Sequence, residues 1–217
     1  MYTDGGCHNT GNRKGNGSYA FLFKTDNKEY VDVHCEYIDN TTNNRMEMAA
    51  VIEGIKYAIG NIPYEIGQSP KYPKLTIVSD SIYLVKGYTD PAYLDRWITN
   101  GWKTSTNKPV QNRDMWLELR RLSWHMGFNF IHIRGHKKDG NKDHAFWNDI
   151  CDRACTYMLN IQQPGFVFIL RYYFKTKKFE IINTQLIERS KSVDCNGCLG
   201  ASEINVRDMR RKDNVKE

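Results

Sequence analysis

The order of the apolar patterns along the chain is the feature that most constrains its fold. Alternating apolar, β-branched and aromatic residues occur at 18–25 and 29–37, which predicts two strands joined by a short hairpin connection. Apolar residues then recur at helical spacing over 43–59. Farther along, we predict strands at 75–79 and 128–134 and helices at 81–86, 91–99, 114–125 and 145–159. Strands before the first helix and strand–helix alternation after it favour a mixed α/β sheet covered by helices.

The pattern changes after about residue 160. A turn signal at 162–165 is followed by two apolar stretches, 166–174 and 179–182, which predict a hairpin. From Glu188 onward the chain is polar and charged, which is typical of a flexible tail. We therefore expect a folded domain over 1–160 and a C-terminal extension over 161–217.

Charge and composition narrow the function classes. The net charge of +6 permits a polyanionic partner, but 161–217 holds 11 Lys+Arg against 7 Asp+Glu and so carries +4 of it. No apolar run is long enough for a membrane span, and no signal peptide is visible at the start. The six cysteines are therefore expected to be reduced thiols, in a cytoplasmic protein that does not enter a membrane.

Four acidic residues occupy places where strand ends and helix starts converge. Asp4 precedes two glycines on the predicted N-terminal strand, Glu47 lies in the first turn of the first helix, Asp80 directly follows a strand, and Asp152 lies on the last helix. Clustered carboxylates repel one another unless cations bind, and oxygen ligands favour Mg²⁺ or Mn²⁺. A pair of such ions suits phosphodiester hydrolysis. Each acid alone also has a local explanation as a turn former, a helix cap or a surface charge, so spacing does not decide.

Six longer motifs favour one reading. The segments YTDGGCHNTG, TTNNRMEMAAVIEGI, IVSDSIYLVKG, NGWKTSTNKPVQNRDMW, IRGH and NDICD occur in this order. With them, the sequence over about 1–160 resembles ribonuclease H of the bacterial type 1 family. The resemblance implies a ribonuclease H-like α/β fold, with a five-stranded mixed sheet whose first three strands are antiparallel and with flanking helices. The C-terminal extension has no counterpart in it.

The resemblance also implies a set of catalytic residues. Asp4, Glu47, Asp80 and Asp152 match the four metal-binding carboxylates of the family, and His136 matches its loop histidine, which assists proton transfer or product departure. Asp149 is a rival to Asp152, but the Asn-x-x-x-Asp spacing selects Asn148 with Asp152.

Further residues match the family's substrate contacts. Small polar groups and backbone that would read the 2′-hydroxyl of RNA are Gly5, Gly6, Cys7, Asn43 and Asn44. Thr42 and Asn112 match the pocket for a DNA phosphate, whereas helix capping remains an alternative for the two asparagines of the first group. Trp97, Trp102 and Lys103 match the basic, aromatic handle, although a packing role for either tryptophan is left open.

The function that follows is an endonuclease acting on the RNA strand of RNA–DNA hybrids. Two Mg²⁺ ions, with Mn²⁺ as a substitute, would support the reaction, leaving 5′-phosphate and 3′-hydroxyl ends, and we expect a monomer. Only 1–3 precede Asp4, so this acid is expected near a fraying end. This short first strand departs from the family pattern and leaves a catalytically impaired hybrid-binding module as an alternative function. A DNA nuclease of the same broad fold is a second alternative.

One cysteine pair in the tail is a weak candidate for zinc. Cys195 and Cys198 form a single CxxC, and no second pair adjoins it. Because a closed zinc site needs four ligands, free thiols are the simpler interpretation.

Overall fold

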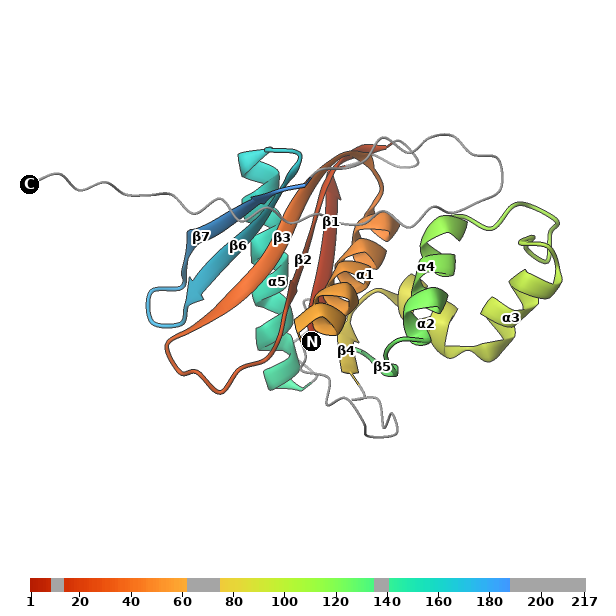
Figure 1. The fold of residues 1–217 in the computed structure, drawn as a ribbon, viewed down its shortest axis with the longest axis horizontal. Helices are drawn as coiled ribbons and strands as arrows, with labels where there is room; N and C mark the ends of the chain where they lie inside the picture. Colours follow the sequence, from red (N-terminus) through yellow and green to blue (C-terminus); the bar gives the residue numbers. More distant parts are fainter. Residues whose placement is uncertain (9–13, 62–74, 135–140, 188–217) are drawn as a thin grey trace, which may run out of the picture.

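A seven-stranded sheet forms the centre of the molecule (Figure 1). The computed structural model describes residues 1–8, 14–61, 75–134 and 141–187. The strand order is β5-β4-β1-β2-β3-β6-β7. The strands are β1 (Tyr2–His8), β2 (Gly15–Leu22), β3 (Tyr30–Thr41), β4 (Leu75–Ser79), β5 (Phe128–His132), β6 (Phe166–Tyr173) and β7 (Lys178–Leu186).

Strand direction divides the sheet into two parts. β1, β2 and β3 are antiparallel neighbours, as the sequence predicts, whereas β4 lies parallel to both β1 and β5. The mixed α/β sheet and its ribonuclease H-like arrangement are thus confirmed. The sheet has seven strands rather than five because the hairpin of β6 and β7 joins it, with β6 antiparallel to β3. The pairing of β3 with β6 spans more than 130 residues, and no local pattern encodes it.

Among the described residues, five helices accompany the sheet. They are α1 (Asn43–Asn61), α2 (Ile82–Thr89), α3 (Pro91–Thr99), α4 (Arg113–Ser123) and α5 (Lys142–Ile161). α5 begins three residues before the predicted start because the Asn141 side chain accepts a hydrogen bond from the Asp143 backbone N–H (3.0 Å) and caps the helix. In the part of the chain that the structure describes, no helix is both long and apolar enough to cross a membrane.

α1 and α5 pack on opposite faces of the sheet (Figure 1). Successive side chains of a strand point to opposite faces. In β2, Ala20 and Leu22 accordingly belong to the core under α5, while Tyr19 and Phe21 belong to the core under α1. The strands at the centre of the sheet are therefore buried on both sides, which fixes their register.

The start of the chain is held in the sheet. The amino group of Met1 donates a hydrogen bond to the Thr76 carbonyl (2.8 Å), and the Met1 carbonyl accepts one from the Val78 backbone N–H (2.9 Å). Burial lowers the pKa of this amino group to about 6. The fraying expected for the residues before Asp4 is therefore absent, because β4 supplies the missing contacts.

The hairpin of β6 and β7 contributes to the same core. On the face that α5 covers, β6 buries Phe168, Leu170 and Tyr172. They pack with α5 residues such as Ala154 and Met158. β6 also pairs with β3 along seven residues, so β3 is not an exposed sheet edge. The described part of the extension is thus structurally continuous with the rest of the sheet.

The cysteines in the described residues are free thiols. Cys35, Cys151 and Cys155 are buried, and Cys7 is partly exposed. Burial raises the pKa of each buried thiol, which disfavours the reactive thiolate. Cys195 and Cys198 lie outside the described residues, so the zinc hypothesis is untested.

Candidate metal centre and nucleic-acid interface

The register of two parallel strands brings Asp4 and Asp80 together. Tyr2 of β1 pairs with Val78 of β4. Asp4 follows Tyr2 by two residues, and Asp80 follows Val78 by two residues, so the two carboxylates lie at the same level on the same face of the sheet. Asp4 is buried, and one of its carboxylate oxygens accepts a hydrogen bond from the Gly5 backbone N–H (2.8 Å).

Glu47 reaches this position from α1, in the second helical turn rather than the first. The helix approaches β1 closely because Gly5 has no side chain: a Cβ atom there would lie 2.2 Å from the Glu47 backbone nitrogen. Glycine at this position therefore makes room for α1. This packing role is not predicted from the sequence, which placed Gly5 among the residues that would read the 2′-hydroxyl of RNA.

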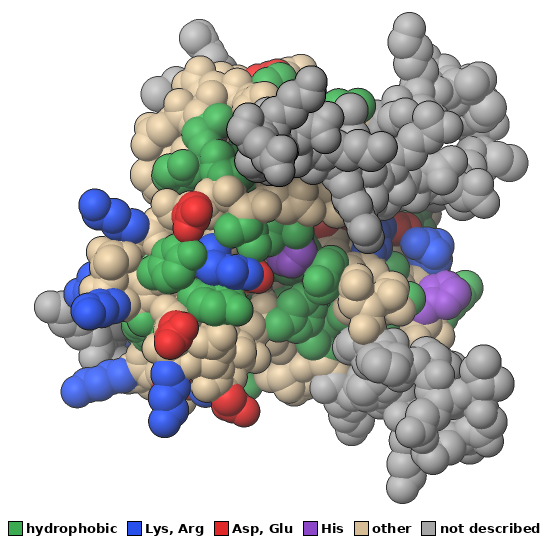
Figure 2. All heavy atoms as spheres, turned by 60° about the vertical axis from the view of Figure 1, so that its left-hand side comes forward, with side chains coloured by type: hydrophobic (Ala, Val, Ile, Leu, Met, Phe, Trp, Pro, Cys, Tyr) green, Lys and Arg blue, Asp and Glu red, His purple; other side chains and the backbone are tan. Residues whose placement is uncertain are grey.

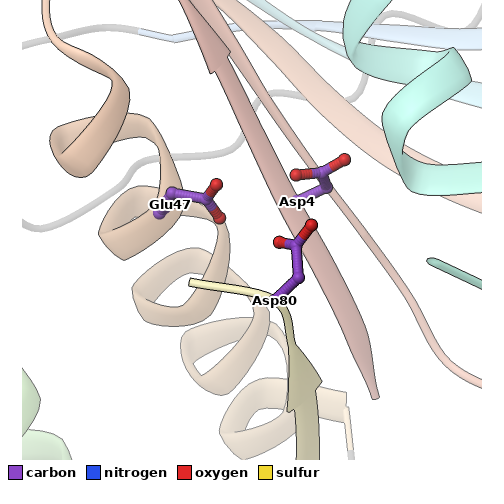
Figure 3. Close-up of side chains that lie close together, drawn as sticks. All are labelled: Asp4, Glu47 and Asp80. Atoms are coloured by element: carbon purple, nitrogen blue, oxygen red, sulfur yellow. The ribbon is translucent and has the colours of Figure 1, made fainter. Parts of the chain in front are cut away.

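The three carboxylates form one cluster (Figure 3). One oxygen from each of Asp4, Glu47 and Asp80 lies within 4.8 Å of the other two. Asp4 and Glu47 are buried, and Asp80 is partly exposed. One oxygen of Glu47, Oε2, is buried with no hydrogen-bond partner among the described residues. A buried carboxylate oxygen without a partner is costly, so this site fits a bound cation.

The electrostatics of the cluster point the same way. The pKa of Asp4 is raised to about 8, mainly by burial and then by the neighbouring charges of Asp80 and Asp152, against the opposing effect of the Gly5 hydrogen bond. Burial, followed by the charges of Asp4, Asp80 and Asp152, raises the pKa of Glu47 well above its ordinary value. In the described part of the chain, every charged group that acts on these two acids is itself an acid. The oxygen-only donor set suits Mg²⁺ or Mn²⁺, and a bound divalent cation would restore the ionised forms.

Asp152 lies at the margin of this cluster. It is partly buried on α5, and its charge raises the pKa of both Asp4 and Glu47, but it is outside the compact group of three. The rival Asp149 is exposed and is not among the groups that shift these pKa values. Asn148 is buried one turn before Asp152, with its side-chain oxygen unpartnered among the described residues. His136 lies outside the described residues.

A groove of about 1050 Å³ runs past the N-terminal end of α1 toward the start of α4. Four of the predicted substrate residues line it together: Thr42, Asn43, Asn44 and Asn112. Cys7 lies on β1, and its thiol donates to the carbonyl of Thr41, another lining residue (3.6 Å). Gly6 precedes it on the same strand, and a Cβ atom there would lie 3.8 Å from the Cβ of Cys155.

The predicted handle is partly a packed structure. Trp102 is buried in the core under α1, and the Arg113 guanidinium lies 5.3 Å from the centre of its ring. Trp97 is partly buried against the same core. The packing role that the sequence leaves open is thus the one that the structure displays for these rings. Lys103 is exposed beside them.

Arg45 is a residue of this interface to which the sequence assigns no role. Its guanidinium pairs with both carboxylate oxygens of Asp114 (3.0 and 2.7 Å) and also lies 3.5 Å from the Asn112 side-chain oxygen. Asn112 has a left-handed backbone (φ 56°), and its amide nitrogen donates to the Tyr83 hydroxyl (3.2 Å). Arg45 and Tyr83 therefore fix the orientation of the Asn112 amide. Arg45 and Asn112 are separated by 67 positions in the sequence, so local sequence patterns do not reveal this link.

Comparisons with known proteins agree with this geometry. The family model described as RNase H matches residues 1–159. A ribonuclease H of Thermoanaerobacter sp. (strain X514) is 36% identical over 159 residues, which cover 72% of this chain and 86% of the relative. Two solved structures share the fold. LC9-RNase H1, a type 1 RNase H with the type 2 active-site motif, has a TM-score of 0.56 at 22% identity and covers 75% of this chain and 72% of its own. A foamy viral protease-reverse transcriptase in complex with RNA/DNA hybrid has a TM-score of 0.53 at 16% identity and covers 72% of this chain and 19% of its own.

Proposed function

Because this chain belongs to the ribonuclease H family and is therefore a ribonuclease H hydrolase, we propose that it is an endonuclease that cuts the RNA strand of RNA–DNA hybrids. The family accounts for nuclease activity on RNA–DNA hybrids in general. The choice of strand, the internal cleavage and the roles of single residues are parts of the proposal. The observation that carries it is the buried cluster of Asp4, Glu47 and Asp80 in a chain of this family.

Asp4, Glu47, Asp80 and Asp152 are the residues proposed to hold two Mg²⁺ ions, for which Mn²⁺ is a substitute. When bound, such a pair activates the attacking water molecule and stabilises the leaving 3′ oxygen. The raised pKa values of Asp4 and Glu47 support this assignment, because among residues 1–8, 14–61, 75–134 and 141–187 only other acids act on them by charge. Asp152 is proposed as the fourth ligand on its family position and on its charge effect at Asp4.

The remaining chemistry is assigned to residues around the cluster. His136 is proposed to move a proton, because imidazole titrates near neutral pH. Asn148 is proposed to face the substrate with its unpartnered side-chain oxygen. Attack on the phosphorus with departure of the 3′ oxygen leaves a 5′-phosphate and a 3′-hydroxyl.

Substrate selection is assigned to the groove and its surroundings. Thr42 and Asn112 are proposed to bind a phosphate of the DNA strand. Lys103 is proposed to contact the same strand electrostatically, with Trp102 buried beneath it as a support. The 2′-hydroxyl distinguishes RNA from DNA, and the residues proposed to read it are Gly5, Gly6, Cys7, Asn43 and Asn44. In one solved neighbour of this fold, the foamy viral protein, a hybrid is bound, which supports the same class of partner here.

The direct test compares labelled RNA–DNA hybrid, duplex DNA and duplex RNA with Mg²⁺ and with a chelator. We expect internal cuts in the RNA strand of the hybrid alone, only with Mg²⁺, and 5′-phosphate ends on the products. Equal cleavage of all three substrates would favour the alternative of a DNA nuclease of the same broad fold. If the protein binds the hybrid without Mg²⁺ but cleaves none of the substrates even with Mg²⁺, the result would favour the catalytically impaired binding module. We also propose that the enzyme acts as a monomer in the cytoplasm.

A further inference from the structure

Three lysines lie in the connection between β6 and β7 and at the first residue of β7. Figure 2 shows that Lys and Arg side chains are common along one edge of the molecule. Lys175, Lys177 and Lys178 lie within four residues, and all three are exposed. We call them the lysine turn. The family model ends at residue 159, so the lysine turn belongs to the extension and has no part in the family's handle.

The charge of the lysine turn is not neutralised within the described residues. None of its three ammonium groups forms an ion pair there. The nearby acid of the hairpin, Glu180, instead accepts a hydrogen bond from the Tyr173 hydroxyl (2.9 Å). Lys24 and Lys56, by contrast, each contact a carboxylate at less than 3 Å. The lysine turn is thus a compact positive surface that is free to meet an anion.

The position of the lysine turn is fixed by contacts with α5. The Arg153 guanidinium donates to the Lys177 carbonyl (2.8 Å) and to the Tyr172 hydroxyl (2.7 Å), and it lies over the Tyr172 ring. The Lys177 backbone N–H donates to the Tyr173 carbonyl (2.8 Å). Arg153 directly follows Asp152, so one arginine side chain separates the lysine turn from the helix that carries the proposed fourth metal ligand.

We propose that the lysine turn is an additional contact surface for the backbone phosphates of the bound nucleic acid. This inference rests on the proposed function, because it takes the duplex to lie at the carboxylate cluster. Each strand of a duplex carries a phosphate about every 3.4 Å, so a bound duplex that extends past α5 presents several phosphates over a short distance. Lysine ammonium groups bind phosphates as point charges without reading the sequence. The extension therefore adds affinity that the family domain lacks.

The test measures binding, not cleavage. Fluorescence anisotropy in a chelator gives the dissociation constant of a labelled hybrid at several KCl concentrations. The test variant combines Lys175→Gln, Lys177→Asn and Lys178→Gln. Asparagine is chosen at 177 because that residue has a left-handed backbone (φ 56°). Lys86→Gln, an exposed lysine on α2, is the control for a simple loss of charge.

For the test variant, we expect the slope of log affinity against log salt to become shallower by roughly 2 to 3, because each lost phosphate contact removes about 0.9. The control should leave the slope almost unchanged, and duplex DNA should respond as the hybrid does. If thermal melting shows that the triple variant is unfolded, the pair Lys175→Gln and Lys178→Gln should lower the slope by roughly 2. An unchanged slope in a folded variant, or an equal change in the control, would overturn the inference.

These outcomes separate the inference from the proposed function. If the wild type binds the hybrid and the variant shows the same slope of log affinity against log salt, only the role of the lysine turn is refuted. A wild-type protein that cleaves nothing with Mg²⁺, but shows the expected change in slope, refutes the catalytic proposal and leaves the contact surface standing.

Discussion

Asp4 on β1 and Asp32 on β3 are two carboxylates in contrasting surroundings. Asp32 accepts two hydrogen bonds from the Arg171 guanidinium (2.8 and 3.0 Å), which also stacks over the Tyr30 ring. The protein thus supplies the cation for Asp32, through the pairing of β3 with β6. Among the residues that the structure describes, the charges that act on Asp4 are those of other acids, and its pKa is raised to about 8. An acid with its own arginine is part of the framework, whereas the buried acids around Asp4 have no such partner among the described residues and form the site proposed above for a cation.

The largest expected effect is a difference in cleavage rate between a substitution in the acidic cluster and a substitution of Asp32. Asp80→Asn removes one charge from the cluster and should reduce hybrid cleavage about 10³-fold, since metal ions contribute several kcal/mol to such transition states. Asp32→Asn should retain cleavage within about twofold, because its partner Arg171 lies in the framework. Initial rates on labelled hybrid measure both. Comparable rates for the wild type and Asp80→Asn would refute the metal role of Asp80.

The second effect concerns the stability that the hairpin adds to the sheet. Leu170 of β6 is fully buried against α5, so Leu170→Ala should lower the free energy of unfolding by about 2–5 kcal/mol. Urea denaturation measures the loss. A loss below about 1 kcal/mol would mean that the core under α5 does not depend on β6. The folded fraction should still cleave at the wild-type rate.

The third effect is a pH dependence of stability set by Asp4. Its carboxyl is protonated in the folded protein below a pKa of about 8, whereas in the unfolded chain it ionises at about 3.8. Between these values the unfolded chain binds fewer protons, so this group makes the free energy of unfolding fall as pH rises, and the fall ends above pH 8. Over pH 6.5 to 8 it amounts to about 2 kcal/mol at most.

A variant isolates the contribution of Asp4 together with its effect on the pKa of Glu47. The lowered pKa values of the Met1 amino group (about 6) and of His34 (about 4) act in the opposite direction, because the unfolded chain binds more protons there. Subtracting the urea-denaturation curve of Asp4→Asn from that of the wild type removes both contributions. The difference should fall with pH in a chelator and flatten with Mg²⁺. A difference independent of pH in the chelator would show that Asp4 has an ordinary pKa.

The smallest expected effect is the loss of stability on removing the ion pair between Arg171 and Asp32. The Arg171 and Asp32 side chains are 27% and 35% exposed, so solvent screens their attraction. Arg171→Met should therefore cost about 1 kcal/mol or less in urea denaturation. It should leave the Mg²⁺ dependence of cleavage unchanged. A loss as large as that of Leu170→Ala would place this ion pair among the main stabilising contacts.

Local patterns predicted most of the elements well. The strand over 75–79 and the helix over 91–99 have the predicted bounds, because their apolar residues and flanking prolines are local signals. The pairing of β6 with β3 could not be predicted in this way, because it joins residues that are far apart in the chain, such as Tyr30 and Tyr173. The count of five strands came from the resemblance, which stops before the extension.

The arrangement of the candidate site was harder to predict from the sequence than the fold, because it depends on contacts between residues that are far apart in the chain. Asp4, Glu47 and Asp80 were identified from motifs, but the pairing of Tyr2 with Val78 that brings two of them level is visible only in the sheet. Trp102 is buried, which the sequence did not predict because its ring could lie either in the core or against a nucleic acid. The link from Arg45 to Asp114 joins α1 to α4 and has no local signal.

The most direct test of cation binding at the acidic cluster is a Mg²⁺ titration that is monitored by NMR. The backbone amide of Gly5 lies beside both Asp4 and Glu47, so its resonance reports the state of the cluster. We predict that this resonance shifts with Mg²⁺ in the wild type and in Asp32→Asn at the same concentrations. In Asp80→Asn it should need at least about tenfold more Mg²⁺, a loss of about 1.4 kcal/mol in binding. Identical titrations for Asp80→Asn and the wild type, or no shift in the wild type, would contradict the account.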